Sequence, residues 1–254
     1  MTFRLIESDP EEDSYRKMAT DEAILQAVSK EKVKPTLRFY RWSKPAVAIG
    51  YFQSVEEEVD VEKCREDDVE IFRRMTGGGA VYKDPTGEIN YSIIVPEDLP
   101  TVPSDIEGSY ERISQCIIRA LEKIGIEAEH SGINDVVVEG RKISGNAQTR
   151  KNGVLLQHGT LLLDFEPEKM VKYLKISEEK SMDKVTSGLE ERVTTLKEMK
   201  PGLSMKEVKE ALKQAFSEKF GHDLQKGDLT DYEEKKAGEL CKEKYGTEDW
   251  NFMR

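Results

Sequence analysis

The chain has 254 residues, of which 37% are hydrophobic and 35% carry a charge, and its formal net charge is −11 at pH 7. A negative charge of this size argues against a nucleic-acid partner, because nucleic-acid binding needs a basic surface. No apolar run approaches the roughly 18 residues that span a membrane, so no membrane partner is expected. The length fits one domain over residues 1–254, with a C-terminal helical part over about 167–254.

The cysteine content indicates a reducing compartment. The three cysteines, Cys64, Cys116 and Cys241, form neither an even-numbered disulfide framework nor a C-x-x-C motif. The charged N-terminal segment also lacks the apolar centre of a signal peptide. We therefore expect a cytoplasmic protein with reduced thiols.

Hydrophobic periodicity predicts the elements of the first quarter of the chain. Residues Thr2 to Glu7 alternate as a short strand. Helical spacing of the apolar side chains predicts a helix from Ser14 to Ala27. The further elements expected are the strands Thr36–Trp42 and Ala46–Ile49 and a short helix Val59–Arg65.

A glycine-rich segment from Ile71 to Val95 reads IFRRMTGGGAVYKDPTGEINYSIIV. We expect a strand ending in two arginines, a tight triple-glycine turn, a second strand, a Pro-Thr-Gly turn and a third strand. Bare glycine backbone can approach a ligand closely and present N–H groups to an anion, and arginine carries a fork-shaped charge suited to phosphate. The segment therefore predicts a phosphate or carboxylate site, with a plain hairpin as the alternative. Because Ala80-Val81-Tyr82 continues as a strand, it is neither a P-loop nor a Rossmann turn.

The rest of the chain predicts one long helix, three strands and a helical C-terminal part. Ser104-Asp105 is expected to cap a helix that runs to Gly125 and buries Cys116 on its apolar stripe. The other elements expected are strands Asp135–Val138, Lys142–Thr149 and Val154–Leu163, helices over 167–175, 205–220 and 230–244, and a helix or loop near 183–198. The predicted class is α+β, with mixed or antiparallel sheets packed with helices.

Three motifs in order carry a family resemblance. They are RRMTGGGAVYKDPTGEIN, NDVVVEGRKISGNAQ and HGTLLLD, and Asp249-Trp250-Asn251 follows near the end. Together they resemble the catalytic domain of the lipoate-protein ligase A family, within the biotin/lipoate ligase and octanoyltransferase superfamily. The resemblance implies the fold of a class II biotin/lipoate ligase catalytic domain.

The resemblance implies an ATP-dependent reaction at a lysine. Lys142 matches the catalytic lysine of the family. Asp135 is expected to be a carboxylate positioned near Lys142 and the metal, with turn chemistry of Asn134-Asp135 as the alternative. ATP and Mg²⁺ are the cofactors expected, because a fixed ammonium beside Mg²⁺ offsets the repulsion between a carboxylate and the α-phosphate. The residues expected to hold the nucleotide are Arg74, Gly77, Gly78, Gly79, Ala80, Val81, Tyr82, Asn90 and Lys142.

A second set of positions is expected to bind the lipoyl substrate. These are Arg73, Tyr51, His158, Gly159 and Gly145. The alternatives from the residues themselves are a structural ion pair for Arg73, core packing for Tyr51 and a hydrogen-bonded core histidine for His158. The histidines show no metal-ligand spacing, so no side-chain metal site is expected.

The chain is expected to be a ligase rather than a transferase. Octanoyltransferases of the superfamily use a cysteine nucleophile, and there is none between Glu129 and Phe165. The expected reaction activates lipoate to lipoyl-AMP and passes the lipoyl group to a lysine of a lipoyl-domain acceptor. Such acceptors are the acyltransferase subunit of 2-oxoacid dehydrogenases and the glycine cleavage H protein. The alternatives are octanoyl or lipoyl transfer without ATP, and a non-catalytic lipoyl-adenylate binding protein.

Two departures from the family pattern qualify this expectation. Lys83 stands where the family commonly has histidine, which adds a positive charge near the expected site. The chain also stops at Arg254, where many bacterial ligases continue into an accessory domain. We therefore expect the stand-alone large subunit of a ligase, with a small accessory subunit as a further partner for activation.

Overall fold

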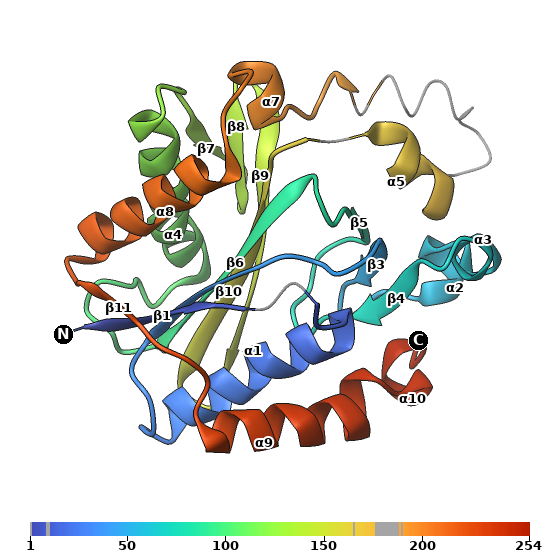
Figure 1. Ribbon diagram of the computed structural model, residues 1–254, viewed down its shortest axis with the longest axis horizontal. Helices are drawn as coiled ribbons and strands as arrows, with labels where there is room; N and C mark the ends of the chain where they lie inside the picture. The colour runs from blue at the N-terminus through green and yellow to red at the C-terminus, as the bar shows by residue number, and fades with distance from the viewer. Residues whose placement is uncertain (1, 9–10, 165, 176–187, 189) are drawn as a thin grey trace.

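The computed structural model describes residues 2–8, 11–164, 166–175, 188 and 190–254. Within these residues the chain forms a large sheet, a small sheet and helices around them (Figure 1), which confirms the predicted α+β class. The strands are β1 Phe3–Glu7, β2 Thr36–Tyr40, β3 Ala46–Ile49, β4 Glu70–Arg73, β5 Val81–Lys83, β6 Glu88–Pro96, β7 Glu129–Ser131, β8 Asp135–Val138, β9 Arg141–Lys151, β10 Val154–Leu162 and β11 Leu224–Lys226. The helices are α1 Ser14–Ser29, α2 Val55–Glu58, α3 Val61–Glu66, α4 Ile106–Lys123, α5 Pro167–Tyr173, α7 Leu196–Met199, α8 Met205–Phe220, α9 Asp231–Leu240, the π-helix η1 Cys241–Tyr245, and α10 Glu248–Asn251.

The large sheet has eight strands in the order β11-β1-β2-β6-β10-β9-β8-β7. At one edge β1 is parallel to both β2 and β11, whereas the pairs from β2 to β7 are antiparallel. The edge strands β7 and β11 were not predicted, because strands of three residues are too short to show an alternation of apolar and polar side chains.

The small sheet corrects the prediction for the glycine-rich segment. Its order is β4-β3-β5, so β4 and β5 lie on opposite sides of β3 and do not pair with each other. Strand β3 is parallel to β4 and antiparallel to β5. The triple glycine is therefore a connection that crosses over β3, not a tight hairpin turn. Sequence pattern alone places strands but does not assign their partners.

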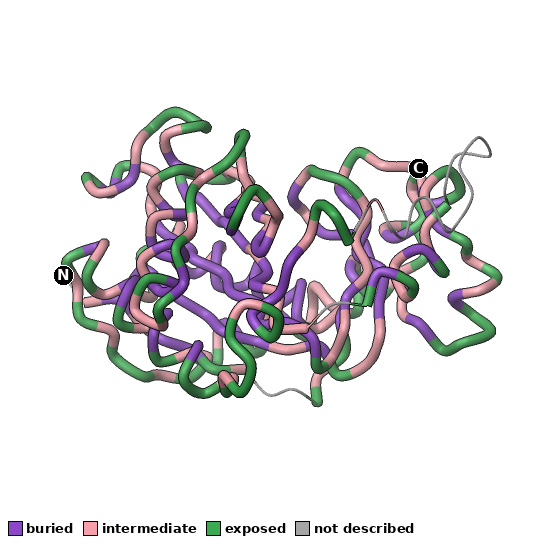
Figure 2. The backbone as a smooth tube through the Cα atoms, turned by 90° about the horizontal axis from the view of Figure 1, so that it is seen from above, coloured by how far each residue is buried: buried purple, intermediate pink, exposed green. Residues whose placement is uncertain are grey.

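The pleat of the large sheet separates two apolar cores. Leu37, Ile93 and Leu155 point to one face, where they pack with α4 and α8. Ile94 and Leu156, one position along the same strands, point to the other face and pack with α1. This alternation follows from the two-residue period of a strand. Figure 2 shows the buried segments running through the interior while the turns are exposed.

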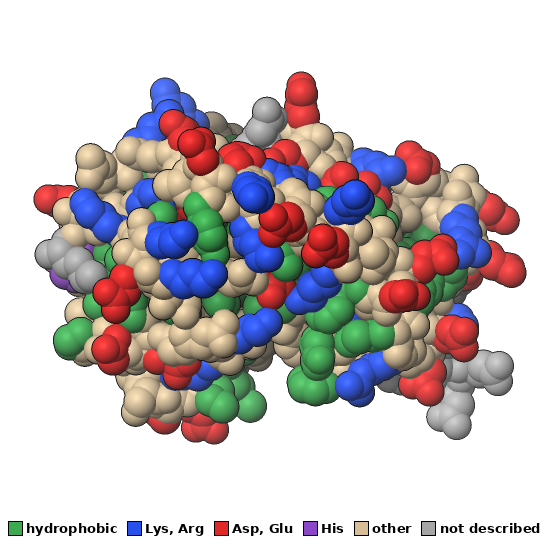
Figure 3. Space-filling view, turned by 90° about the horizontal axis from the view of Figure 1, so that it is seen from below, with side chains coloured by type: hydrophobic (Ala, Val, Ile, Leu, Met, Phe, Trp, Pro, Cys, Tyr) green, Lys and Arg blue, Asp and Glu red, His purple; other side chains and the backbone are tan. Residues whose placement is uncertain are grey.

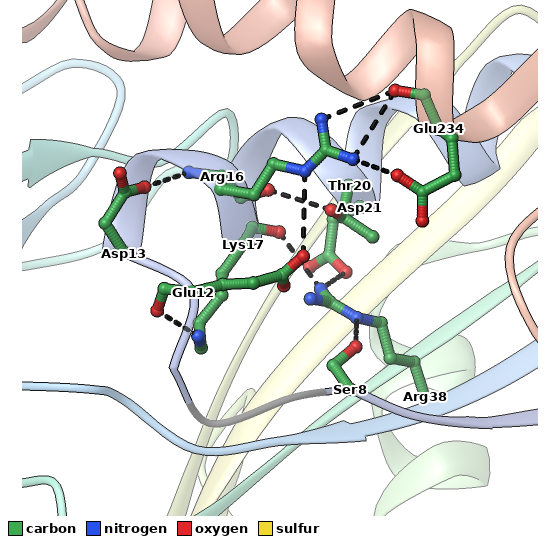
Figure 4. A network of polar contacts seen from close by, with 9 residues as sticks. All are labelled: Ser8, Glu12, Asp13, Arg16, Lys17, Thr20, Asp21, Arg38 and Glu234. Atoms are coloured by element: carbon green, nitrogen blue, oxygen red, sulfur yellow. Dashed lines mark hydrogen bonds and ion pairs between the residues drawn. The ribbon is translucent and has the colours of Figure 1, made fainter.

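Helix α1 is fixed to the large sheet by a buried ion pair (Figure 4). Its N-cap Asp13 accepts a hydrogen bond from the backbone N–H of Arg16. Farther along the helix, Asp21 accepts a hydrogen bond from Arg38 of β2 at 2.6 Å between Nη1 and Oδ1. Arg16 forms an ion pair with Glu234, which joins α1 to α9. Helix α1 is thus held on one side by the sheet and on the other by α9.

The C-terminal helices depart from the predicted pattern in two ways. The helix expected over 230–244 continues from α9 into the π-helix η1. Residues 183–187 and 189 of the segment near 183–198 lie outside the described residues, and α7 begins within its last part. Cys116 lies on the buried face of α4, as predicted.

The end of the chain is anchored by Arg73. This side chain is fully buried and donates hydrogen bonds to the backbone carbonyls of Gly50, Tyr51 and Gln53. It also donates to the carbonyls of Trp250 and Asn251 in α10. Arg73 therefore joins the loop after β3 to the last helix through one guanidinium group.

The surface carries charges of both signs. Figure 3 shows Lys and Arg side chains interspersed with Asp and Glu over the face in view. Among the described residues, no helix combines the length and the apolar character needed to cross a membrane.

Replacing Arg73 tests this anchor. Arg73→Lys keeps the charge but removes the planar fork, so several buried carbonyls lose their donor. We expect the free energy of unfolding in urea to fall by at least about 2 kcal/mol. The matched control is Arg65→Lys on the exposed face of α3, for which the change stays within about 0.5 kcal/mol. Equal stability of the two variants would contradict the anchoring role.

Candidate functional site

A cavity of about 600 Å³ lies between the large and the small sheet. Strands β6, β8, β9 and β10 form one wall, and β3, β5 and the glycine-rich loop form the facing wall. The apolar part of the lining comprises Met18, Tyr40, Trp42, Ala48, Phe72, Val81, Val137, Ala147, Leu162, Met170 and Val193. The charged part comprises Arg74, Lys83, Glu88, Asp135, Lys142 and Arg192.

A bulge between β8 and β9 turns Lys142 toward this cavity. Asp135 pairs with Gly145, whereas Val137 pairs with Lys142, and the register shifts between Val136 and Val137. Without the shift, Lys142 and Gly145 would point to opposite faces, because they are three positions apart on one strand. With it, both line the cavity, and the Lys142 ammonium forms an ion pair of 2.7 Å with Asp135 Oδ1.

The backbone around Lys142 is held from two sides. Its N–H donates to the carbonyl of Arg192, and its own carbonyl accepts from the N–H of Thr194. Farther along β9, Asn146 Nδ2 donates to the carbonyl of Asn134 at 2.8 Å, and Asn146 Oδ1 accepts from the Tyr91 hydroxyl at 2.6 Å. The turn before β8 and the strand that carries Lys142 are therefore joined by side-chain hydrogen bonds. Asn146 was not predicted as a site residue.

Arg74 gives the glycine-rich loop its shape. Its guanidinium is buried and donates to the carbonyls of Gly77 at 2.8 Å and Gly79 at 2.9 Å. Burial lowers the pKa of Arg74 to about 10. Gly78 adopts a φ of 98°, and its carbonyl lies where a Cβ on Gly50 would be, at 1.9 Å. Arg74 therefore lines the cavity while much of its donor capacity is used by the loop itself.

A second charged pair lies in the cavity wall. Lys83 of β5 is buried, and its ammonium is 3.4 Å from Glu88 Oε1. The ammonium also donates to the hydroxyl of Thr160, and the indole N–H of Trp42 donates to Glu88. Burial raises the pKa of Glu88, and burial lowers the pKa of Lys83. Thr160 was not singled out in the sequence, although it follows the His158-Gly159 pair directly.

His158 joins the cavity to the buried ion pair of α1. Its Nε2 lies 2.7 Å from Thr76 Oγ1, and its Nδ1 lies 3.6 Å from Asp21 Oδ2. Burial lowers the pKa of His158, and the Asp21 carboxylate opposes that shift. Thr76 is the residue before the triple glycine, so His158 connects the loop to the ion pair between Asp21 and Arg38.

Most of the predicted site residues do meet at this cavity. Its lining includes Arg74, Gly78, Gly79, Val81, Tyr82, Asn90, Asp135, Lys142, Gly145, His158 and Gly159. Gly77 and Ala80 belong to the same loop but do not line the cavity.

Two of the expected substrate contacts are placed elsewhere. Arg73 lies outside the cavity, because its guanidinium is committed to backbone carbonyls around α10. Tyr51 also lies outside it and packs against Phe52 and Trp250. The prediction that these two side chains contact a substrate in this cavity is therefore corrected. Packing describes Tyr51, as its alternative proposed, whereas Arg73 has a structural role through backbone carbonyls and not through the ion pair considered for it.

No cysteine of the chain lines the cavity. Cys64 and Cys116 are fully buried in apolar clusters, and burial raises the pKa of both thiols to about 12. Cys241 is partly exposed in η1, and burial raises the pKa of its thiol too. A thiolate near Lys142 is therefore not available from these positions.

The charged side chains of the cavity can be compared with what binding of ATP and Mg²⁺ would require. Lys142, Arg74 and Lys83 are cations that suit a phosphate, but each already has a partner in the protein. Within the described residues, no group of three or more His, Cys, Asp or Glu side chains could hold a metal ion. ATP and Mg²⁺ thus stay predictions from the sequence alone.

Comparisons with known proteins identify relatives of two kinds. The chain is 34% identical over 277 residues to Octanoyltransferase LipM of Halalkalibacterium halodurans, covering 100% of this chain and 99% of that protein. It is 37% identical to Octanoyltransferase LipM of Clostridioides difficile, covering 93% and 94%. It also superposes with a TM-score of 0.90 and 32% identity on a structure from the archaeal lipoylation system of Thermoplasma acidophilum, described as a bi-partite lipoate protein ligase and its E2 lipoyl domain, covering 99% and 96%.

These relatives overturn the expected enzyme class. Curated proteins that match nearly the whole chain are named octanoyltransferases, so the prediction of an ATP-dependent lipoate-protein ligase was wrong. That prediction depended on one observation, the lack of a cysteine between Glu129 and Phe165. The missing thiol excludes one transferase mechanism but does not by itself require ATP. The expectations of lipoylation chemistry and protein modification are confirmed.

The buried ion pair between Asp21 and Arg38, next to His158, predicts how the free energy of unfolding depends on pH. Burial raises the pKa of Asp21, but the charge of Arg38, the neighbouring His158 ring and a hydrogen bond from Ser92 outweigh it, so the pKa lies below its ordinary value. The stabilisation is therefore complete above about pH 5 and is lost as the pH falls through the folded-state pKa. Asp21→Asn should lower the free energy of unfolding at pH 7 by about 3–5 kcal/mol and flatten its acid dependence. The control is Asp98→Asn at an exposed position; matching acid profiles for the two variants would refute the assignment.

Family membership follows from the match and the geometry together. The model of the Lipoyl protein ligase A/B catalytic domain matches residues 13–217. That range contains the glycine-rich loop, the bulged strand with Lys142 and the strand with His158. The chain therefore belongs to the Lipoyl protein ligase A/B catalytic domain family.

Proposed function

We propose that this chain is an acyltransferase that moves an octanoyl group from an activated donor to a lysine of a lipoyl-domain protein, without ATP. The observation that carries the proposal is the cationic, thiol-free cavity in a chain whose curated full-length relatives are named octanoyltransferases. Transfer without ATP requires a donor that is already activated, and a thioester is the acyl donor of that class.

The apolar lining is suited to a medium-length acyl chain. Met18, Trp42 and Phe72 come from separate elements and present hydrophobic surface to one space. A cavity of about 600 Å³ falls within the range of small-molecule sites, which is about 300–1,000 Å³. Burial of the acyl chain there would leave its carbonyl at the charged part of the wall.

The cations favour both halves of an acyl transfer. The Lys142 ammonium can stabilise the oxyanion that forms when the carbonyl is attacked, because its ion pair with Asp135 holds it in place. Nearby positive charges also lower the pKa of an incoming lysine amine, which favours its neutral, nucleophilic form. The same positive charges also stabilise the leaving thiolate.

The cavity favours direct transfer over an acyl-enzyme thioester. The acceptor amine would attack the thioester carbonyl itself, since the three cysteines lie in other parts of the fold. This single displacement distinguishes the proposal from a cysteine-dependent transferase. An acceptor of the lipoyl-domain type is consistent with the family and with the archaeal system that pairs a related protein with an E2 lipoyl domain.

The test measures the intact mass of a lipoyl-domain acceptor. One reaction contains this protein and an octanoyl thioester on an acyl carrier protein, and no ATP. A parallel reaction contains free octanoate and MgATP instead. A gain of one octanoyl group in the first reaction supports the proposal. A gain only in the second, or in neither, would overturn it.

Removal of every thiol provides a sharper check of direct transfer. We expect the combined variant Cys64→Ala, Cys116→Ala and Cys241→Ser to retain transfer, because no thiol lines the cavity. Loss of a true nucleophile costs about 10⁶-fold in a serine protease, so the two cases are easily separated. The readout is the transfer rate, with circular dichroism as the control for folding. An inactive but folded variant would exclude the direct route.

Gly145→Ala tests the position of Lys142. A Cβ at Gly145 would lie 2.7 Å from Lys142 Cε and 2.9 Å from Nζ, so the flexible end of Lys142 must move. Because a misplacement of about 1 Å can cost about 10²-fold, we expect a rate loss of that order with little change in stability. The matched control is Ser144→Ala on the opposite face of β9, which should leave the rate unchanged. Equal rates for both variants would show that Lys142 is not at the reacting carbonyl.

A further inference from the structure

Lys83 is a buried cation in the cavity wall. The side chain is about nine-tenths buried, at 11% exposure, and it lines the same cavity as Lys142. It comes from β5 in the small sheet, on the opposite wall from Lys142 in β9. A lysine is rarely buried without a role, because burial disfavours its charge.

The sheet register places the two lysines over neighbouring positions. Asn90, Thr160, Gly145 and Asp135 are directly paired across β6, β10, β9 and β8, so they form one row on the cavity face. The Lys142 side chain lies over Gly145, and the Lys83 ammonium is hydrogen-bonded to Thr160. The two ammonium groups therefore approach the same part of the row from opposite walls.

We propose that Lys83 is a second catalytic cation, which donates to the oxygen of the reacting acyl carbonyl opposite Lys142. This inference rests on the acyl transfer proposed above. As the acceptor nitrogen bonds to the carbonyl carbon, the π electrons move to oxygen, where both ammonium groups stabilise them. The oxyanion then re-forms the C=O bond as the C–S bond breaks with its electron pair going to sulfur, and the proton lost by the nitrogen goes to the departing thiolate, which leaves an amide and a thiol.

The neighbours of Lys83 explain why it can serve this purpose. Glu88 holds the ammonium at 3.4 Å and Thr160 directs it, so a donor is positioned before the substrate arrives. Around it, Arg74 and Lys142 are positive and Glu88 is negative. Burial and the two cations lower the pKa of Lys83, while Glu88 opposes this. Glu88 and the Asp135 partner of Lys142 balance the three cations Arg74, Lys83 and Lys142 only in part, so an oxyanion would offset the positive charge that remains.

The experiment compares three variants in the thioester assay. Lys83→Met removes the donor, and we expect kcat to fall by about 10²-fold or more with little change in KM. Lys83→Met combined with Glu88→Gln removes the buried charge that the single variant leaves unpaired. Stability should be regained in the double variant while activity is not, which separates catalysis from folding. The control is Lys169→Met, whose ion pair with Asp84 lies outside the cavity.

The pH profile gives a readout that a structural role would not move. If Lys83 must be charged, the wild-type rate falls as the pH rises through its lowered pKa. In Lys83→Arg the charge is permanent, so the basic limb of the profile should move to higher pH even if the maximal rate is reduced. An unchanged basic limb in this variant would contradict the inference.

The outcomes also separate this inference from the proposed function. If the unaltered protein transfers no octanoyl group, the proposed function fails and this inference fails with it. If it transfers normally and the Lys83→Met and Glu88→Gln double variant matches it, only the role of Lys83 is refuted. An octanoyl adduct on Thr160 found by mass spectrometry would also refute it, since Lys83 would then serve a nucleophile.

Discussion

The site depends on the one-residue register shift between β8 and β9. Antiparallel strands otherwise keep side chains three positions apart on opposite faces, and Lys142 would then point away from Gly145 and Asp135. The shift places all three on the cavity face, and the carbonyl of Arg192 and the N–H of Thr194 hold the bulged strand. A bulge conserves the hydrogen bonding of the flanking residues while it redirects one side chain. The ion pair between Lys142 and Asp135 is thus a consequence of backbone geometry.

Charge in the cavity is distributed over two walls. One wall carries Lys142 with Asp135 and also Glu88, and Lys83 reaches from the facing wall to pair with Glu88. Each cation keeps a carboxylate partner, which limits the cost of holding positive charge inside the protein. Because the two walls belong to different sheets, the distance between the cations depends on how the sheets pack. The apolar cluster of Met18, Trp42 and Phe72 between the sheets therefore contributes to electrostatics as well as to stability.

Much of the fold could be predicted from the sequence, because the spacing of apolar residues in a long segment indicates whether it forms a helix or a strand. The strand Ala46–Ile49, the helix from Ser14 and the buried side of α4 with Cys116 all agree with the spacing of apolar residues. The spacing of apolar residues does not predict which strands pair with each other. The triple glycine fitted a hairpin as well as the crossover around β3, since glycine permits both. Likewise, Arg73 and Arg74 look equivalent in the motif, yet one anchors α10 and the other shapes the loop, which only tertiary contacts decide.

The placement of the cysteines has a consequence for redox chemistry. Enzymes that transfer acyl groups through a thiolate are stopped when that thiolate is oxidised or alkylated. Here the thiols of Cys64 and Cys116 are buried with pKa values raised to about 12, and Cys241 lies in a helix away from the cavity. An acyl transfer catalysed by ammonium groups without a thiol would continue under oxidising conditions that inactivate a thiol-dependent enzyme.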